Sequence, residues 1–506
     1  MVPFSMTKKA AGVPVTLFLD PRSALTLQRQ VYDGLRTAIL TGRLRPGLRL
    51  PSTRSLAEDL AVSRNTVAAA FGQLVAEGYA EARVGAGTKV ARTLPEDLRK
   101  VTAGLVPPEA RFSPRISRRG ETLSGARVTA GFTTLRPFRP GWPALDQVPL
   151  ELWWRLAART GRRIGRSLLG YGELGGYRPL RKAIAEYLAV SRGVRCTEEQ
   201  VIVTSGSQQG LFVASQVLLD PGDRVWIEDP AYPGTRSALQ AAGARLVPIP
   251  VDLEGIDVRF AETRAAARLV AVAPSHQYPL GVTMTLARRL ELLRVARRMR
   301  AWVLEDDYDS EFRYSSRPIA ALQGLDHDGR VIYLGTFSKT LFPSLRLGYA
   351  VVPVELVGPF TAARSVLDIH SPLFEQAVLT EFITGGYFER HLRRMRSLYE
   401  ERQQTLVAEA ERCLSGLLEL TPARAGLQCV GWLAPDLDER AVTRAAAAHD
   451  VEVTPISAFA VRRLARSGLL LSFGAFEPNQ IRAGVRRLAE ALEDVRAGRR
   501  PARLGA

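Results

Sequence analysis

The segment YLGTFSKTLFPSLRLGY, residues 333–349, decides the fold class. An apolar run opens it, and Lys339 follows in a turn that carries glycine, threonine and serine. In open α/β sheets, ligands bind in crevices at the carboxyl ends of the strands. The segment therefore predicts an α/β domain with a functional site at Lys339.

Short apolar runs elsewhere predict the other strands of this sheet. The runs and the start of the quoted segment lie at residues 200–204, 224–228, 268–273, 301–305 and 330–335. Continuous apolar strands separated by helices are typical of a largely parallel sheet that is covered on both faces. The polar residues of interest should then lie where these strands end.

Two of these strand ends suit a flat, phosphorylated ligand. A turn that opens a helix follows the first strand, and backbone amides at a helix N-terminus hold phosphate groups. The residues of this turn are Ser205, Gly206, Ser207 and Gln208. Tyr232, after the next strand, offers an aromatic face for stacking on a heterocycle. Taken alone, a Ser-Gly-Ser turn or a single tyrosine is more often structural.

The motif EDDY, residues 305–308, ends a further strand. A carboxylate such as Asp306 keeps a pyridine nitrogen protonated, and a phenol such as Tyr308 binds the ring hydroxyl. Lys339 supplies an amine that attacks an aldehyde when burial or nearby positive charge lowers its pKa, and Arg346 can pair with a phosphate. Together these residues predict pyridoxal 5'-phosphate, held as a Schiff base on the catalytic lysine Lys339.

With these motifs, about residues 130–495 resemble the fold-type I aminotransferases. The resemblance implies that Asp306 contacts the ring nitrogen, Tyr308 the ring hydroxyl and Tyr232 the ring face. The phosphate contacts that it implies are Ser205, Gly206, Ser207, Gln208, Ser338 and Arg346. It also implies a homodimer with domain swapping, in which Tyr171 of one subunit reaches the phosphate site of its partner.

Two positions depart from that family. Enzymes of this fold commonly have Asn-Pro-x-Gly where this chain has YPLG, residues 278–281, so His276 or Gln277 is expected to replace the asparagine contact to the cofactor. They also commonly have an arginine for the substrate carboxylate where this chain has Leu470. The second departure argues against transamination of ordinary α-amino acids.

The N-terminal part of the chain has a different pattern. Apolar residues at helical spacing predict helices over residues 25–40, 50–60 and 63–77, and a glycine-bearing hairpin over 79–90 follows. Three helices and a hairpin in this order predict a winged helix-turn-helix, which places the third helix in the major groove of DNA. The polar residues placed for contact are Arg54, Arg64, Asn65 and Thr66.

This part resembles the GntR family of bacterial regulators through LPSTRSLA, residues 50–57, and VSRNTV, residues 62–67. The resemblance covers about residues 20–90. It implies that the same four polar residues contact DNA, and it adds the wing glycine Gly85.

Composition sets the boundaries and the partners. We expect a DNA-binding domain at 20–90, a basic linker rich in proline and arginine at 91–128, a cofactor-binding domain at 129–495 and a basic tail at 496–506. The net charge is +18, and thirteen basic against six acidic residues fall before residue 95. An acidic partner such as nucleic acid explains this balance, although arginines on solvated helix faces are the alternative.

The sequence also argues against several classes of protein. Three irregularly spaced cysteines indicate neither a disulfide framework nor a metal site. We find no apolar run long enough to span a membrane and no export signal. A cytoplasmic protein without a metal is therefore expected.

The whole arrangement resembles the MocR subfamily of transcriptional regulators. The resemblance implies a dimer that binds double-stranded promoter DNA in the cytoplasm and is associated with the nucleoid when bound. Its binding would be set by pyridoxal 5'-phosphate on Lys339, with or without a small amine or amino-acid effector that forms an external aldimine. Such a protein is a sensor more than an enzyme. The rival interpretation is a working aminotransferase with an appended DNA-binding domain, and a third is a body that serves only as a dimerisation scaffold.

Overall fold

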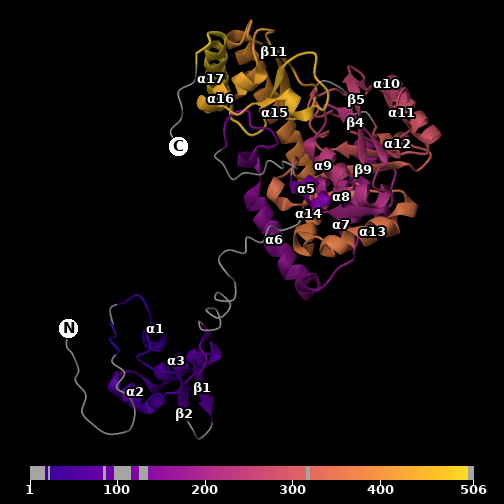
Figure 1. Cartoon of the computed structure of the whole chain (residues 1–506). Helices are drawn as coiled ribbons and strands as arrows, with labels where there is room; N and C mark the ends of the chain where they lie inside the picture. Colours follow the sequence, from indigo (N-terminus) through magenta and orange to yellow (C-terminus); the bar gives the residue numbers. More distant parts are fainter. Residues whose placement is uncertain are drawn as a thin grey trace. The chain divides into compact units, whose positions relative to one another are not determined.

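The computed structural model describes residues 17–20, 23–83, 87–95, 116–124, 135–314 and 320–499. The chain folds into two compact units, residues 1–115 and 116–506 (Figure 1). Each unit has its own hydrophobic core. Among the described helices, none is long and apolar enough to cross a membrane.

The smaller unit consists of three helices and a hairpin. The elements are α1 (Leu27–Leu40), α2 (Thr53–Asp59), α3 (Arg64–Ala76), β1 (Ala80–Arg83) and β2 (Gly87–Val90). Each helix begins where a hydroxyl side chain accepts a hydrogen bond from a backbone amide of the first turn, a common N-cap arrangement. The strands pair antiparallel. The predicted winged helix-turn-helix is therefore present.

The larger unit is built on an eight-stranded sheet. Its spatial order is β3 (Val201–Thr204), β10 (Gly348–Val351), β9 (Val331–Thr336), β8 (Trp302–Asp307), β7 (Leu269–Val272), β4 (Arg224–Asp229), β5 (Arg245–Asp252) and β6 (Gly255–Ile256). The five strands from β9 to β5 are parallel. Four of them, β9, β8, β7 and β4, coincide with apolar runs that predict strands, whereas β5 was not predicted. The sheet is nevertheless mixed, because β10 is antiparallel to both of its neighbours.

The direction of β10 follows from its short connection. A parallel crossover needs about a dozen or more residues and usually a helix. The link from β9 to β10, residues 337–347, contains only the 3-10 turn Pro343–Leu345. It therefore returns the chain antiparallel, and the turn that carries Lys339 stays at the carboxyl edge of the parallel strands.

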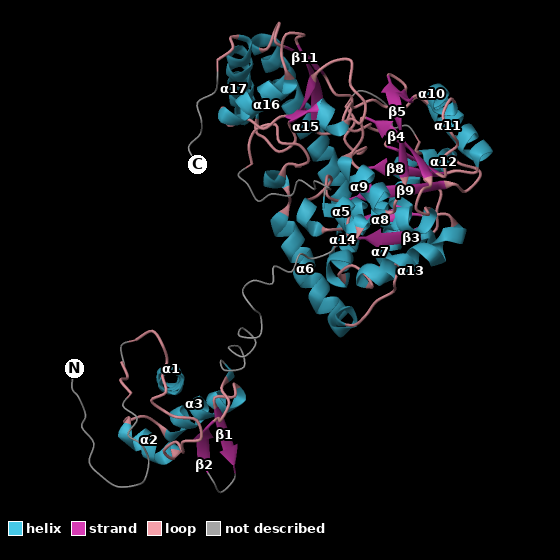
Figure 2. Cartoon of the chain, in the orientation of Figure 1, coloured by secondary structure: helices cyan, strands magenta, loops and turns pink. Residues whose placement is uncertain are grey.

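Helices surround this sheet (Figure 2). Successive residues of β9 pack into different clusters, since Tyr333 joins one hydrophobic core while Ile332 and Leu334 join another. Such alternation shows that both faces are covered. The helices of this layer are α6 (Leu150–Ile164), α7 (Arg178–Arg192), α8 (Ser207–Leu218), α9 (Pro233–Ala241), α10 (Val258–Glu262), α11 (Leu286–Met299), α12 (Leu322–Leu325), α13 (Val357–Asp368) and α14 (Leu373–Thr384).

A second, antiparallel sheet lies toward the C-terminus, and the sequence pattern had indicated only its strand near Leu470. Its order is β11 (Leu418–Thr421), β12 (Gln428–Leu433), β14 (Gly468–Ser472) and β13 (Thr454–Pro455). The helices α15 (Tyr387–Cys413), α16 (Glu439–Ala448) and α17 (Pro478–Arg496) accompany it in the yellow part of Figure 1.

A short helix falls inside the segment that the sequence indicates as a linker. This helix is α5 (Arg118–Ser124), which lies against α9 of the larger unit. Arg119 donates a hydrogen bond to Gln216 Oε1 of α8, at 2.6 Å. Residues 118–124 of the predicted linker are therefore folded onto the larger unit.

Candidate functional site

Lys339 lies in the turn between β9 and β10. Its Nζ donates a hydrogen bond to the carbonyl oxygen of Gly141, at 2.6 Å. Burial lowers the pKa of the Lys339 ammonium, and the nearby carboxylates Asp309 and Asp306 partly oppose that shift. A lysine with a lowered pKa is neutral for part of the time and can act as a nucleophile.

The phosphate contacts expected from the sequence gather at the start of α8. Gly206 caps this helix with a φ of 90°, and no side chain caps it. Arg346 Nη2 donates to the carbonyl oxygen of Ser205, at 2.6 Å. A Cβ atom on Gly206 would lie only 3.1 Å from the same guanidinium. The helix N-terminus and Arg346 thus form one cationic cradle, which suits a phosphate dianion.

The other residues predicted to contact the phosphate differ in which of their polar groups already make hydrogen bonds within the protein. The side chain of Gln208 donates to the carbonyl oxygen of Gly234. Its backbone amide, in the first turn of α8, is therefore the group left to donate to a phosphate. The Ser205 hydroxyl lies 3.2 Å from Asp368 Oδ2. The Ser338 amide donates to Thr336 Oγ1 at 3.1 Å, and Ser207 begins α8.

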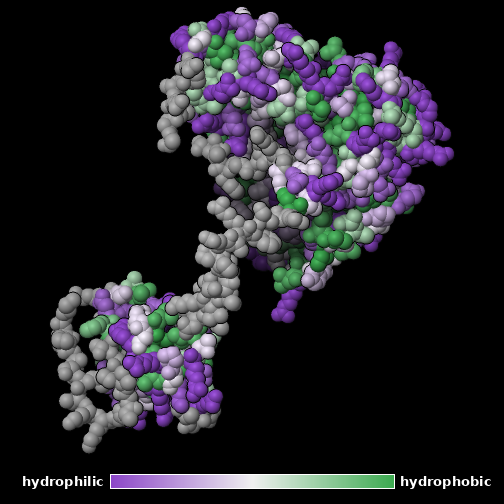
Figure 3. Space-filling model, in the orientation of Figure 1, coloured by the Kyte–Doolittle hydropathy of each residue, from purple (hydrophilic) through white to green (hydrophobic). Residues whose placement is uncertain are grey.

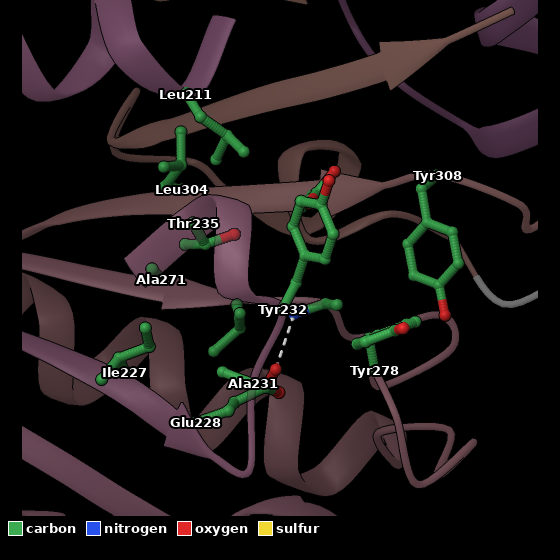
Figure 4. A pocket seen from close by; sticks show the side chains of 13 residues that line it. Leu211, Ile227, Glu228, Ala231, Tyr232, Thr235, Ala271, Tyr278, Leu304 and Tyr308 are labelled. Carbon is green, nitrogen blue, oxygen red and sulfur yellow. Dashed lines mark hydrogen bonds between the residues drawn. The ribbon is translucent and has the colours of Figure 1, made fainter. Parts of the chain in front are cut away.

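A pocket brings together Tyr232, Asp306 and Tyr308. Figure 4 shows Tyr278 and Tyr308 on one side of it and Leu211 and Leu304 on the other. The Tyr278 ring centroid lies 5.6 Å from that of Tyr232 and 6.0 Å from that of Tyr308. Tyr278 was not predicted to line this pocket, because in the sequence it stands out only as the residue that replaces an asparagine.

Two buried carboxyls face this pocket. Asp306 Oδ1 is buried and has no hydrogen-bond partner. Burial, followed by the charges of Asp307 and Asp309, raises the Asp306 pKa to about 7. Burial also raises the pKa of Glu228 to about 8, although Glu228 Oε2 accepts hydrogen bonds from the Ala273 amide and from Gln277. An unpaired buried carboxyl is costly unless a ligand supplies its partner.

These features fit pyridoxal 5'-phosphate. The orphaned oxygen of Asp306 suits a protonated ring nitrogen, and the cradle at Gly206 and Arg346 suits the phosphate. Lys339, whose pKa is lowered, suits the aldehyde. Tyr232 and Tyr308 line the pocket between these groups, where the ring would lie.

The replacement expected for the missing asparagine contact has a specific geometry. Gln277 is fully engaged, because it donates to the Pro230 carbonyl at 2.7 Å and accepts from the Leu280 amide at 3.1 Å. His276 Nδ1 lies 3.0 Å from the Tyr308 hydroxyl and 3.0 Å from both carboxylate oxygens of Asp309. Asp309 is a site residue that sequence reasoning missed, although it directly follows the motif EDDY.

Tyr171 lies at the surface, with 86% of its area exposed. Its ring meets the edge of His370 at 6.2 Å, and the amide of the next residue, Gly172, donates to His370 Nε2. The expected contact of Tyr171 with a second subunit stays a prediction.

In the smaller unit, the predicted DNA-contacting residues lie at the start of α3 and on α2. Arg64 and Asn65 are exposed, and the Thr66 hydroxyl lies 2.8 Å from that of the N-cap Ser63. Arg54 forms an exposed ion pair with Glu58 at 3.1 Å. Gly85 lies outside the described residues.

Fold and site define a chain with the head of a bacterial regulator and the body of an aminotransferase. The family model for bacterial regulatory proteins of the gntR family matches residues 27–90, and that for class I and II aminotransferases matches residues 143–488. The chain is 43% identical to the probable rhizopine catabolism regulatory protein MocR of Rhizobium meliloti, covering 94% of this chain and 96% of that protein. It belongs to the MocR type of gntR-family transcriptional regulators.

Further relatives and solved structures agree with this assignment. The transcriptional regulator TauR of Rhodobacter capsulatus is 33% identical over 95% of this chain and 100% of its own length. The pyridoxine biosynthesis regulator PdxR of Corynebacterium glutamicum is 29% identical over 95% of this chain and 99% of its own. Among solved structures, the α-aminoadipate aminotransferase LysN of Thermus thermophilus is similar with a TM-score of 0.67 and 30% identity, covering 75% of this chain and 96% of that one.

The protonation of Glu228 gives a test of the site through stability. Its native pKa of about 8 lies above the ordinary value of 4.5, so the native state holds this proton more tightly than the unfolded chain does. The wild type should therefore lose stability relative to Glu228→Gln as the pH rises from about 4.5 to about 8. Urea unfolding at several pH values measures this difference.

The matched control is Glu186→Gln, an exposed carboxylate on α7. Its stability difference from the wild type should stay within a few tenths of a kcal/mol, about what an exposed pair contributes. A difference for Glu228→Gln that is flat or shrinks with rising pH would contradict a buried, protonated Glu228.

Proposed function

We propose that this protein binds promoter DNA as a dimer and that pyridoxal 5'-phosphate on Lys339 sets this binding. The observation that carries the proposal is the orphaned buried oxygen of Asp306, at one edge of the sheet with Lys339 and Arg346. A body that served only as a scaffold would have no use for a buried carboxyl, a lysine and an arginine gathered at one site. The proposal places the protein in the cytoplasm, associated with the nucleoid while it is bound.

The DNA-binding part of the proposal rests on the head. Arg64, Asn65 and Thr66 occupy the first turn of α3, the position from which a recognition helix reads base edges in the major groove. Arg54 on α2 is free to reach phosphates, because its exposed pair with Glu58 contributes little. Gly85 would complete the contact through the wing.

The cofactor would be held by the residues gathered in the larger unit. Lys339 would bind it covalently, Asp306 would keep its ring nitrogen protonated and Tyr308 would donate to its ring hydroxyl oxygen. Tyr232 would stack on the ring, while Arg346 and the first amides of α8 would hold the phosphate. When bound, the cofactor supplies an electrophilic carbon conjugated to an electron-withdrawing ring.

Regulation then follows from linkage. A ligand changes DNA affinity only to the extent that it prefers one of two conformations of the protein. An amine effector that displaces Lys339 from the cofactor frees the lysine side chain and so offers such a preference. The effector need not carry a carboxylate, because Leu470 is fully buried in an apolar cluster with Val430, Ile456 and Phe459.

Dimerisation is supported by apolar side chains around Tyr171 that are exposed in the single chain. Figure 3 shows hydrophobic side chains reaching the surface in patches between hydrophilic ones. Those on α6, on the turn before Tyr171 and at the junction of α13 and α14 are Trp154, Leu169, Ile369 and Phe374. A Cβ on Gly161 of α6 would lie 3.5 Å from the Phe374 ring, so these segments are neighbours. Exposed apolar patches of this kind mark protein interfaces.

Replacing Lys339 tests the cofactor's role. In Lys339→Ala the cofactor should no longer be covalently retained after borohydride reduction and denaturation. Any change that the cofactor causes in DNA affinity, on the order of 5-fold or more for a typical coupling, should disappear in fluorescence-anisotropy titrations. Lys182→Ala, an exposed lysine on α7, serves as the control and should behave as the wild type does. Cofactor-dependent DNA binding that survives in Lys339→Ala would refute the proposal.

A charge at the apolar surface tests the dimer. Leu169→Glu should shift the protein toward the monomer in sedimentation equilibrium, since it places a carboxylate where the partner's apolar surface would pack. Leu253→Glu changes an equally exposed leucine in the turn between β5 and β6 and should leave the mass unchanged. Equal masses for the two variants would place the interface elsewhere.

The rival function, a working aminotransferase, predicts sustained turnover. With cofactor, an α-amino acid and a keto acid, we expect at most one half-reaction per site, because Leu470 supplies no charge for a carboxylate. Product formation measured against the protein concentration decides this point. Many turnovers per site would favour the enzyme.

A further inference from the structure

Asp309, His276 and Tyr308 form a continuous buried chain of polar atoms beside Lys339. His276 Nδ1 lies 3.0 Å from Asp309 Oδ1, 3.0 Å from Asp309 Oδ2 and 3.0 Å from the Tyr308 hydroxyl. The side chains of His276 and Asp309 are 1% and 3% exposed. One ring nitrogen therefore faces three oxygens at hydrogen-bonding distance.

The backbone around His276 holds the ring in one orientation. Gly426 has a φ of +81°, and a Cβ there would lie 2.0 Å from His276 Cε1. A Cβ on Gly281 would lie 3.3 Å from His276 Nε2. Both glycines therefore leave room for the imidazole that a side chain at either position would take up.

Two observations indicate which nitrogen carries the proton. An ionised carboxylate only accepts hydrogen bonds, so the Nδ1 atom that faces both oxygens of Asp309 has to donate. His276 Nε2 is buried and has no hydrogen-bond partner. A proton there would be a buried donor without an acceptor, which is costly. Both observations favour a proton on Nδ1.

We propose that His276, held by Asp309, is a positioning residue that fixes the direction of the hydrogen bond made by Tyr308. With the proton on Nδ1, this nitrogen has no free lone pair, so the Tyr308 hydroxyl cannot donate to His276. The phenol proton of Tyr308 is then directed away from His276 and toward the ligand side of the pocket. The last step rests on the proposed function, in which the ring hydroxyl oxygen of the cofactor receives this proton.

The charges around Tyr308 are compatible with this role. Burial raises the pKa of the Tyr308 phenol well above its ordinary value, and Asp309 adds to that shift. The other titratable groups that act on it are Tyr278, Asp306 and Glu228. All of them disfavour a phenolate, so Tyr308 keeps the proton that it would donate.

The first test requires no cofactor. In protein labelled with ¹⁵N in histidine, His276 should show a protonated Nδ1, an unprotonated Nε2 and a strongly downfield Nδ1 proton resonance that is absent in His276→Asn. A protonated Nε2 with a bare Nδ1 would overturn the assignment whether or not the protein binds the cofactor.

The second test uses the pH midpoint at which the visible absorbance of the cofactor-loaded protein changes. A weaker hydrogen bond from Tyr308 would leave more negative charge on the cofactor's ring oxygen. This charge would hold a neighbouring proton more tightly, so the pH midpoint would rise. Tyr308→Phe should raise it by roughly one pH unit or more, the equivalent of one hydrogen bond to a charged group. His276→Leu should raise it in the same direction, while His276→Asn, whose amide keeps a donor near the Nδ1 position, should stay closer to the wild type.

A double-mutant cycle separates positioning from a direct electrostatic effect. In the Tyr308→Phe background, His276→Leu should not move the midpoint further, because the route through the phenol is already lost. An equal shift from His276→Leu with and without the Tyr308 hydroxyl would overturn the proposal, and so would no shift in either background. If neither the wild type nor the variants show visible absorbance when the cofactor is added, the result counts against the proposed cofactor. The ¹⁵N measurement of the tautomer still decides the assignment for His276.

Discussion

The site depends on the close approach of three glycines where β3, β10 and β9 meet. Gly348 of β10 stands opposite Thr204 of β3 and Thr336 of β9 in the sheet register. A Cβ on Gly348 would lie 2.9 Å from backbone atoms of Gly206 and from the carbonyl oxygen of Gly335. On Gly335 a Cβ would lie 2.2 Å from the Tyr349 ring. No side chain larger than hydrogen fits at these positions, and this packing brings the Lys339 turn, Arg346 and the start of α8 together.

Around this frame the buried charges divide into two groups. Asp307 is partly satisfied, because its Oδ2 pairs with Arg192 at 2.8 Å and accepts from the Tyr333 hydroxyl at 2.6 Å, whereas its Oδ1 has no partner. Its neighbour Asp306 points to the opposite face of β8, as successive residues of a strand do, and its Oδ1 atom has no partner. The pair of Arg192 and Asp307 anchors the end of the strand, whereas Asp306 faces the pocket lined by Tyr232 and Tyr308.

Much of this could be predicted from the sequence. Apolar runs indicated five strands of the large sheet, and polar residues at their ends indicated Lys339, Asp306 and Tyr232. The antiparallel course of β10 was not predicted, because it depends on the length of a connection and not on periodicity. Asp309 was missed because the same motif already offered carboxylates closer to the end of the strand. Only the fold places His276, which is far from Asp309 in sequence, against it.

We propose that pyridoxal 5'-phosphate and DNA are coupled through this one protein. Reciprocity of coupling tests it most directly, since each ligand must change the affinity for the other by the same factor. The measurement is the dissociation constant of pyridoxal 5'-phosphate, with and without a DNA duplex that the protein itself has selected from a random pool. We predict a change by the same factor that the cofactor produces in DNA affinity. A dissociation constant of pyridoxal 5'-phosphate that is the same without DNA and with DNA at a saturating concentration would rule out this coupling.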